Sequence, residues 1–487
     1  MTTLDTLYID GAFVAGSGAP FDVVDPATED VITSINAATP GDVEAALRSA
    51  AAGFAVWKAT DPWTRSARLR EVARLLRERA DEIAASLTAE QGKPLAQARL
   101  EVLSGADQFD WHADEARRLY GRVVESRNPT DRITVRREPV GVIAAFTPWN
   151  FPVLLPARKI SAALAAGCAI VLKPAEETPL TGLHLANACH DAGIPAGVVN
   201  VLFGAPAAIS EQLIASDVVR KVTLTGSVPV GVQLMTLAAR GVKPISLELG
   251  GHAPVVVFDD VDVDKAAVMC ADAKFRNAGQ VCIAATRFIV QDSMVADFSA
   301  AFVRRTSELR VGYGTDPTSD IGPLTNARRV DMVEHLVADA VERGAELLAG
   351  GCRPTKFAKG HWYEPTVLGG VTPDAELLRT EPFGPVAPIL PFASFDEAIT
   401  LANSTPYGLA GYVLTNDAAR GMLASEALEC GMVGVNNFAL ATAEAPFGGV
   451  KSSGFGREGG SEGILDYTHT KYVNVRLDTS SIVTGTA

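Results

Sequence analysis

The segment from 140 to 249 alternates short, wholly apolar runs with stretches of helical periodicity, and this alternation constrains the fold more than any other feature. Strands that are apolar along their whole length and separated by helices are typical of a parallel sheet covered on both faces. We therefore expect an α/β fold with a binding site at the carboxyl ends of the strands. The predicted strands are 141–146, 169–172, 198–203, 219–224 and 245–249, and the predicted helices are 153–166, 182–192, 207–215 and 225–237.

A second α/β series extends from about 253 to 430. Because 487 residues exceed what one hydrophobic core usually supports, we expect two parallel-sheet domains rather than one. The predicted strands of the second series are 254–258, 287–291, 346–348 and 363–369, and its helices are 263–275, 295–309, 328–343 and 395–403.

The first 120 residues predict strands and then helices. Runs at 7–9, 21–24 and 31–35 predict a small antiparallel meander. Asp42 is expected to cap a helix that ends near Trp57, and Thr64 to cap a longer helix that stops at Gly92. A third helix is expected from 95 to about 119, where His112 is interpreted as a packing or surface residue.

The segment 122–140 alternates apolar and charged residues without a helical face, which predicts a strand pair exposed to solvent or to a partner subunit. A strand at 472–477 is expected to join it, either in the same chain or in another subunit. The segment 446–460 has too many glycines for regular structure to be expected.

Composition excludes several classes of protein. A net charge of −14 and a pI near 5.1 argue against binding to nucleic acid or to an anionic membrane, because both need a basic surface. No secretory leader or long apolar run occurs, so we expect a cytoplasmic protein. The six cysteines form no CxxC pair and the histidines no HExxH motif, so we predict neither disulfides nor a metal site.

Two side chains stand out as candidates for chemistry. Cys282 lies in a run of small and polar residues, FRNAGQVCIAATR, where a thiolate could act as nucleophile if a base or a positive charge is near. The alternative is a buried cysteine that behaves as a small hydrophobe. Glu248 ends an apolar strand, LELGG, between Leu247 and Leu249, and a charge in that setting needs a purpose.

Seven motifs occur in one order along nearly the whole chain: TPWNFP (147–152), KPAEETP (173–179), TGSVPVG (225–231), LELGGHAP (247–254), FRNAGQVC (275–282), EPFGPV (381–386) and PFGGVKSSG (446–454). With them the chain resembles the aldehyde dehydrogenase superfamily, and most of all its succinic and α-ketoglutaric semialdehyde branch. The resemblance implies that Cys282 is the nucleophile, that Glu248 is the general base, and that Asn150 and the Cys282 amide stabilise the oxyanion.

The resemblance also implies a nicotinamide cofactor. A carboxylate at Glu176 accepts ribose hydroxyls and repels a 2′-phosphate, which favours NAD over NADP. The GxxxxG spacing of Gly226 and Gly231 is weak evidence alone, because a plain turn before a helix has the same spacing. The implied cofactor-binding residues are Pro148, Trp149, Lys173, Glu176, Gly204, Gly226, Ser227, Gly231, Glu381 and Phe383.

In the semialdehyde branch two arginines and a hydroxyl hold the distal carboxylate of the substrate, and the matching positions here are Arg158, Arg276 and Thr442. The expected activity is oxidation of a carboxylated semialdehyde through a thiohemiacetal and a thioester. One alternative is an aldehyde dehydrogenase of broad specificity for aliphatic or aromatic aldehydes, in which those arginines are ordinary helix-surface residues. Another is a cofactor-binding protein without catalysis.

At two positions the sequence differs from the family that it resembles. Ala284 stands where the mammalian members of the succinic semialdehyde branch have a second cysteine, so a redox switch is not expected here. His252 stands where lysine is commoner, and a structural role is expected for it.

The resemblance further implies a Rossmann-like NAD-binding domain (1–121 and 141–252), a catalytic domain (253–430), an oligomerisation arm (122–140 and 468–487) and a segment that returns to the cofactor domain (431–467). A homodimer or homotetramer is expected.

Overall fold

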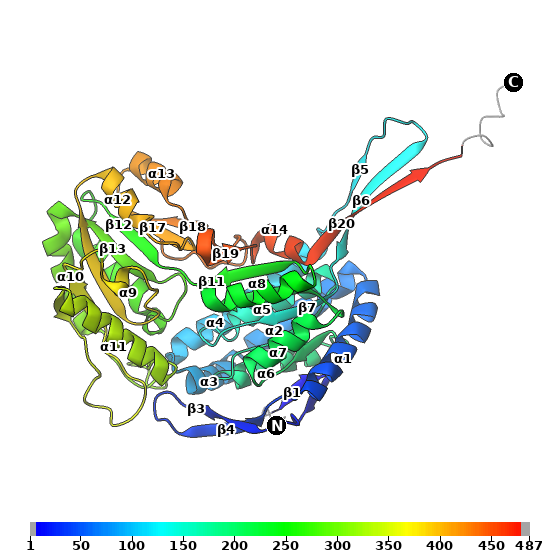
Figure 1. The fold of residues 1–487 in the computed structure, drawn as a ribbon, viewed down its shortest axis with the longest axis horizontal. Coiled ribbons are helices and arrows are strands. Elements are labelled where there is room, and N and C mark those ends of the chain that lie inside the picture. The colour runs from blue at the N-terminus through cyan, green and yellow to red at the C-terminus, as the bar shows by residue number, and fades with distance from the viewer. Residues whose placement is uncertain (1–5, 479–487) are drawn as a thin grey trace.

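The apolar runs form the two large sheets of the protein. In the computed structural model, which describes residues 6–478, each sheet lies at the centre of one lobe and a β arm projects from the body (Figure 1). Two separate clusters of buried apolar side chains surround the two sheets. The expected α/β class with two parallel-sheet domains is thereby confirmed. Residues 1–5 and 479–487, which the expected domain and arm boundaries include, lie outside the described part.

The first sheet has eight strands in the order β19-β11-β10-β7-β8-β9-β1-β2. Its five central strands are parallel, while β1, β2 and β19 add to the edges in antiparallel fashion. The strands are β1 (Leu7–Ile9), β2 (Ala12–Val14), β7 (Val142–Phe146), β8 (Ala169–Lys173), β9 (Val199–Val201), β10 (Val219–Gly226), β11 (Ile245–Leu249) and β19 (Gly454–Phe455).

Helices connect the parallel strands of this sheet and cover it. The connecting helices are α5 (Leu154–Ala166), α6 (Pro179–Asp191), α7 (Pro206–Ala215) and α8 (Val228–Arg240). The N-terminal helices, of which α2 and α4 pack over α5, are α1 (Pro40–Ala59), α2 (Pro62–Glu78), α3 (Ala80–Gln91) and α4 (Leu95–Glu115). Every residue of α5 is therefore buried.

The second sheet has seven strands in the order β14-β15-β16-β13-β12-β17-β18, all parallel except β14. The strands are β12 (Ala253–Val257), β13 (Ala285–Gln291), β14 (Glu346–Ala349), β15 (Thr366–Gly369), β16 (Val386–Phe392), β17 (Ala410–Leu414) and β18 (Met432–Val435). The helices are α9 (Val263–Phe275), α10 (Val295–Glu308), α11 (Ala327–Glu342), α12 (Phe395–Ala402) and α13 (Ala418–Ala427).

The arm is a three-stranded antiparallel sheet of β5 (Arg122–Val124), β6 (Asp131–Pro139) and β20 (Thr468–Arg476). The C-terminal strand β20 pairs with β6 of the same chain along its whole length. Within residues 6–478, no helix combines the length and the apolar composition needed to cross a membrane.

Several local expectations need correction. The expected N-terminal meander is two hairpins: β1 and β2 extend the first sheet, while β3 (Pro20–Val24) and β4 (Val31–Asn36) form a sheet of their own. The expected irregular segment 446–460 contains β19, because Gly454 with φ +105° lets the chain pair with β11. The second sheet extends to β18 at 432–435, beyond the expected domain limit of 430, because α13 returns the chain to a free edge.

Candidate active site

The loop that carries Cys282 has an uncommon backbone. After α9 the chain forms a short 3₁₀ turn in which Asn277, Ala278 and Gly279 have φ of +50°, +53° and +74°. A side chain at position 279 would lie 2.2 Å from the Gly384 carbonyl oxygen, so glycine is required there. The left-handed conformation costs roughly 1–2 kcal/mol at Ala278, so surrounding contacts must hold the loop.

Cys282 lies where two hollows meet. It lines a cleft with about 1050 Å³ of empty space together with Asn150, Gly226, Glu248 and Glu381. It also lines a pocket with about 730 Å³ of empty space. One thiol is therefore accessible from both sides.

The pocket has apolar walls and positive charge. Phe151, Leu154 and Phe447 contribute to the walls, and Arg158 and Arg276 also line it. A small molecule with an apolar body and an anionic group would match this lining.

Arg158 is only 2% exposed, yet its Nε and Nη2 atoms have no hydrogen-bond partner among the described residues. Its guanidinium lies 4.1 Å from the centre of the Phe447 ring, and Nη1 is 4.0 Å from Glu458 Oε2. Burial lowers the pKa of Arg158, which the charges of Glu458 and Cys282 oppose. Buried N–H groups without partners are costly unless a ligand supplies acceptors.

Arg276 is exposed and lies 5.8 Å from the Phe151 ring, at the border between this pocket and a neighbouring apolar hollow. Thr442 does not line this pocket. It lines an adjoining hollow, which shares Ser104 and Ala441 with the pocket of Cys282. The structure thus places the two arginines at the pocket and Thr442 beside it.

Glu248 ends β11 with its carboxylate facing the cleft, and the side chain is 3% exposed. Neither carboxylate oxygen has a hydrogen-bond partner among residues 6–478. Burial raises the pKa of Glu248 well above its usual range, the charge of Glu458 raises it further, and Lys159 and Arg158 oppose the shift. A carboxylate of raised pKa is a stronger base.

The motifs did not identify Lys159 or Glu458, which form a buried charged cluster beside Glu248. Lys159 Nζ donates to Glu458 Oε1 at 2.6 Å and to Thr223 Oγ1 at 3.0 Å. The sequence feature that could have pointed to this cluster is Lys159 itself, because a lysine in a mostly apolar buried helix such as α5 needs a buried partner.

Asn150 follows β7 and is 2% exposed. Its Nδ2 donates one proton to the Gln280 carbonyl at 3.1 Å, in the turn just before Cys282. The Oδ1 atom has no hydrogen-bond partner among the described residues, and the side chain lines the cleft.

The Cys282 side chain is half-buried, and burial raises the pKa of its thiol to about 12. Glu381 and Glu248 also raise this pKa, while Arg158 lowers it. Without a ligand the thiol is therefore protonated at neutral pH.

The expected cofactor residues lie in the cleft, around Glu176 and in the first turn of α8. Pro148, Trp149, Gly226 and Ser227 line the cleft, as do Glu381 and Phe383. Lys173, at the end of β8, pairs with Glu176, whose Oε1 accepts a bond from the Gly204 amide at 3.3 Å.

Gly231 lies in the first turn of α8, where a side chain would come within 2.7 Å of Leu249. It therefore allows α8 to approach β11. His252 is buried and its pKa is lowered by burial, so its ring is neutral: Nε2 donates to the Leu377 carbonyl at 2.9 Å and Nδ1 accepts from Thr286 Oγ1 at 2.7 Å, in keeping with a structural role.

Glu381 and Phe383 form the wall of the cleft opposite α8. Glu381 accepts a hydrogen bond from the Gly251 amide at 3.1 Å, and burial raises its pKa to about 7. Phe383 meets Trp149 edge to face, with ring centres 5.5 Å apart.

Comparison with known proteins finds similar enzymes over nearly the whole chain. The 4-(hydroxymethyl)benzenesulfonate dehydrogenase TsaD1 of Comamonas testosteroni is 46% identical over 93% of this chain and 94% of its own. The succinate-semialdehyde dehydrogenase (NADP(+)) GabD of Escherichia coli K12 is 41% identical over 95% and 96%. The crystal structure of succinate-semialdehyde dehydrogenase from Burkholderia pseudomallei superposes with a TM-score of 0.96 at 42% identity, covering 98% and 99% of the two chains.

The model of the aldehyde dehydrogenase family matches residues 13–473. The chain therefore belongs to the aldehyde dehydrogenase family, whose members oxidise aldehydes with NAD(P).

Proposed function

We propose that this protein oxidises an aldehyde with a distal carboxylate, a semialdehyde, to the dicarboxylic acid with NAD as the favoured cofactor. The observation that carries the proposal is the position of Cys282 between the cleft and a pocket that contains a buried arginine with unpaired N–H groups. In this proposal the first lobe and the arm correspond to the cofactor and oligomerisation units, and the second lobe supplies the nucleophile.

The cleft residues fit a dinucleotide. Ser227 is the N-cap of α8, yet its side chain makes no capping hydrogen bond, so its hydroxyl and the first amides of α8 are free to meet a pyrophosphate. Lys173 and Glu176 would hold the adenosine ribose, and Glu381 the nicotinamide ribose. A bound nicotinamide would supply the hydride acceptor for the oxidation of the thiohemiacetal to a thioester.

The side chains of the chain itself account for the other steps. The Cys282 thiol loses its proton to water in the cleft, and the resulting thiolate attacks the aldehyde carbon to form the oxyanion of a thiohemiacetal. Asn150 donates a side-chain N–H to the oxyanion, as does the Cys282 amide, and one such donor contributes roughly 3 kcal/mol. Glu248 then takes a proton from the water that hydrolyses the thioester.

The substrate class depends on Arg158. Its free Nε–H and Nη2–H present the planar fork that binds a carboxylate through two bonds. Arg276, at the rim, adds a second positive charge. The names of two relatives support an anionic substrate, since a succinate semialdehyde carries a carboxylate and a benzenesulfonate a sulfonate.

A second candidate is broad specificity for aliphatic or aromatic aldehydes. The apolar walls formed by Phe151, Leu154 and Phe447 favour it, because they would accept an uncharged chain or ring.

Replacing Arg158 by leucine tests the proposal. We expect Arg158→Leu to lower kcat/KM for succinic semialdehyde about 10- to 100-fold, because a charge-assisted bond contributes roughly 1.5–3 kcal/mol. The ratio of this kcat/KM to the kcat/KM for butanal, which has the same length and no charge, should fall about tenfold or more, because a less reactive thiol slows both aldehydes equally.

Arg48→Leu is the control, because Arg48 is an exposed arginine of α1. An equal loss for both aldehydes, or a wild type that prefers butanal, would transfer the assignment to the second candidate.

A further inference from the structure

The segment Glu90–Glu101 links α3 to α4 and contains polar side chains that solvent does not reach. Glu90, Gln91, Lys93 and Glu101 are each at most 4% exposed. Burying two carboxylates, an amide and an ammonium is unfavourable unless each polar atom is bonded. The direction of these bonds shows what the segment does.

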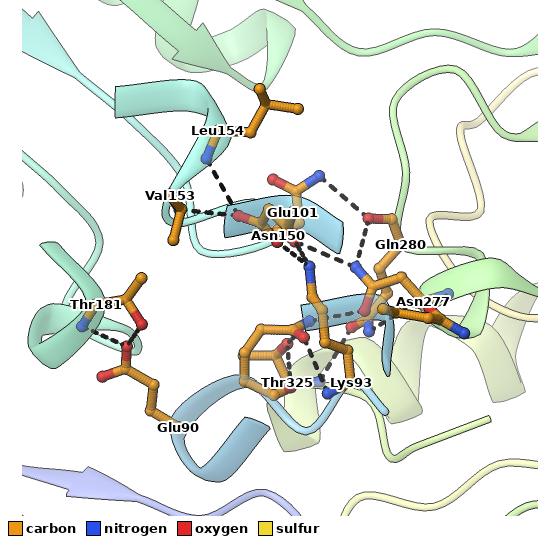
Figure 2. A network of polar contacts seen from close by, with 12 residues as sticks. Glu90, Lys93, Glu101, Asn150, Val153, Leu154, Thr181, Asn277, Gln280 and Thr325 are labelled. Carbon is orange, nitrogen blue, oxygen red and sulfur yellow. Dashed lines mark hydrogen bonds and ion pairs between the residues drawn. The ribbon is translucent and has the colours of Figure 1, made fainter. Parts of the chain in front are cut away.

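Lys93 makes contacts in three directions. Its Nζ donates to Glu101 Oε2 at 2.5 Å and to the main-chain carbonyl oxygen of Asn150 at 2.8 Å (Figure 2). It also lies 4.1 Å from the centre of the Phe151 ring. An ammonium has three protons, so these contacts account for all of them.

The other carboxylate oxygen of Glu101 binds the start of α5. Its Oε1 accepts the amide protons of Val153 at 2.8 Å and Leu154 at 3.2 Å (Figure 2). No side chain within α5 caps this end, so Glu101 supplies the cap from a distant part of the chain. Arg158 follows one turn later in the same helix.

The segment also contacts the loop of Cys282 from the other lobe. Gln91 Nε2 donates to Asn277 Oδ1 at 3.1 Å. Asn277 Nδ2 donates in turn to the Asn150 carbonyl at 3.2 Å. The Asn150 carbonyl thus receives a lysine from one lobe and an asparagine amide from the other, as Figure 2 shows.

We propose that Lys93 and Glu101 are positioning residues, which hold the backbone of Asn150 and the first turn of α5 so that the Asn150 side chain faces the oxyanion formed at Cys282. The proposal rests on the proposed role of Asn150 as an oxyanion donor. Both residues also line the pocket of Cys282, but the hydrogen bonds that carry the proposal go to the main chain at 150–154.

A structural role alone would predict a different pattern of effects. If the pair only stabilised the fold, its loss would lower the melting temperature and leave the contribution of Asn150 intact. If it positions Asn150, its loss makes the Asn150 side chain ineffective, and removing that side chain then has little further effect.

The test is a double-mutant cycle of Lys93→Met and Asn150→Ala. The readout is the rate of NADH appearance in the first turnover, because the oxyanion forms in that step. In wild type we expect Asn150→Ala to slow this rate about 100-fold. We expect Lys93→Met to slow it 10- to 100-fold, and Asn150→Ala to add less than about fivefold in that background.

Glu101→Gln provides a second background if Lys93→Met does not fold. Glutamine keeps an acceptor for the Val153 and Leu154 amides but cannot accept from Lys93, and we expect the factor for Asn150→Ala to shrink here too.

Glu90→Gln is the matched control. Glu90 belongs to the same segment and is equally buried, but it accepts the amides of Leu180 at 2.9 Å and Thr181 at 2.8 Å, at the start of α6. In this background Asn150→Ala should slow the first turnover as much as it does in wild type.

The outcomes separate the two proposals. If Asn150→Ala has no effect in wild type, the role of Asn150 itself fails. If it slows wild type about 100-fold and slows the Lys93→Met and Glu101→Gln variants equally, the role of Asn150 stands and the positioning role is overturned.

Discussion

At the scale of single residues, the charges around the Cys282 thiol act in opposite directions. Burial raises the pKa of this thiol most, the Glu381 carboxylate raises it further, and the Arg158 guanidinium lowers it. An uncharged alkylating reagent can report the balance of these charges, because it reacts with the thiolate and does not bind to the arginine.

We predict that iodoacetamide modifies Cys282 about 3- to 10-fold faster in Glu381→Gln than in wild type at pH 8, and slower by a similar factor in Arg158→Leu. The factors remain modest because a thiolate of lower pKa is a weaker nucleophile. Mass spectrometry of the peptide that contains Cys282 measures the rate, in a background where the exposed Cys352 is serine. Changes in the same direction for both variants would contradict this electrostatic account.

Glu176 determines the second residue-scale prediction. Its carboxylate pairs with Lys173 and is 28% exposed. In the proposed function it accepts a ribose hydroxyl and would repel a 2′-phosphate. We predict a kcat/KM ratio of NAD to NADP of about 10 to 100, which should fall at least tenfold in Glu176→Ala.

The opposite preference is known by name among the relatives, since GabD is named as an NADP(+) enzyme. Equal use of both cofactors by wild type would mean that Lys173 neutralises the carboxylate and binds the 2′-phosphate.

At the scale of elements, buried carboxylates cap two helices of the first lobe. Glu101 caps α5, and Glu90 accepts both amides and the hydroxyl at the start of α6. Burial nevertheless outweighs these donors and raises the pKa of Glu90 to about 8.

This shift predicts a dependence of stability on pH. Because the folded protein binds the Glu90 proton more tightly than the unfolded chain does, the contribution is fully present below about pH 4.5 and is lost as the pH rises through 8. Relative to Glu90→Gln, wild type should lose on the order of a few kcal/mol of unfolding free energy between pH 5 and pH 8.5.

Urea unfolding at several pH values measures this difference, with Glu82→Gln, an exposed carboxylate of α3, as control. A wild type that gains stability over the same range would show that the three donors stabilise the Glu90 anion more than burial destabilises it.

Long elements were predictable from sequence because their pattern is repeated over many residues. The strands from β7 to β11 and helices such as α9 lie within a few residues of their expected limits. Helix starts were less predictable. Thr39, not Asp42, is the N-cap of α1, with Asp42 three residues later in a capping box. Asp61, not Thr64, caps α2.

The missed features depend on contacts between distant segments. One long helix was expected from Thr64 to Gly92, but the chain breaks at Arg79 into α2 and α3. The two residues of β19 form a strand only because β11 is beside them. Cys282, Glu248 and Asn150 were proposed from motifs. The contacts of Lys93 and Glu101 with the main chain at 150–154 could not be predicted, because they depend on how the fold brings these distant segments together.

At the scale of the whole molecule, the candidate site lies between the two lobes. The cleft and the pocket are lined by residues of the first lobe, such as Asn150 and Glu248, and of the second, such as Cys282 and Glu381. Among residues 6–478, none of the arm lines either hollow, and Figure 1 shows the arm projecting away from the body. The arm therefore needs a different explanation.

One face of the arm is apolar and uncovered. Val124 of β5 and Tyr472 of β20 are 39% and 62% exposed, and their pairing with Ile133 and Val135 of β6 places the four side chains on one face. Three strands with an uncovered apolar face are expected to bury it against a partner, and we propose that the partner is another copy of this chain.

We predict that Val124→Lys combined with Tyr472→Lys reduces the oligomer to a smaller species, because burying two lysines in the contact is unfavourable. Sedimentation velocity at micromolar concentration measures the change, and the activity per chain should stay within about twofold because the described residues of the arm line neither the cleft nor the pocket. Val31→Lys, at an exposed valine of β4, is the control and should leave the sedimentation coefficient as in wild type. An unchanged sedimentation coefficient in the double variant would show that this face does not hold the copies together.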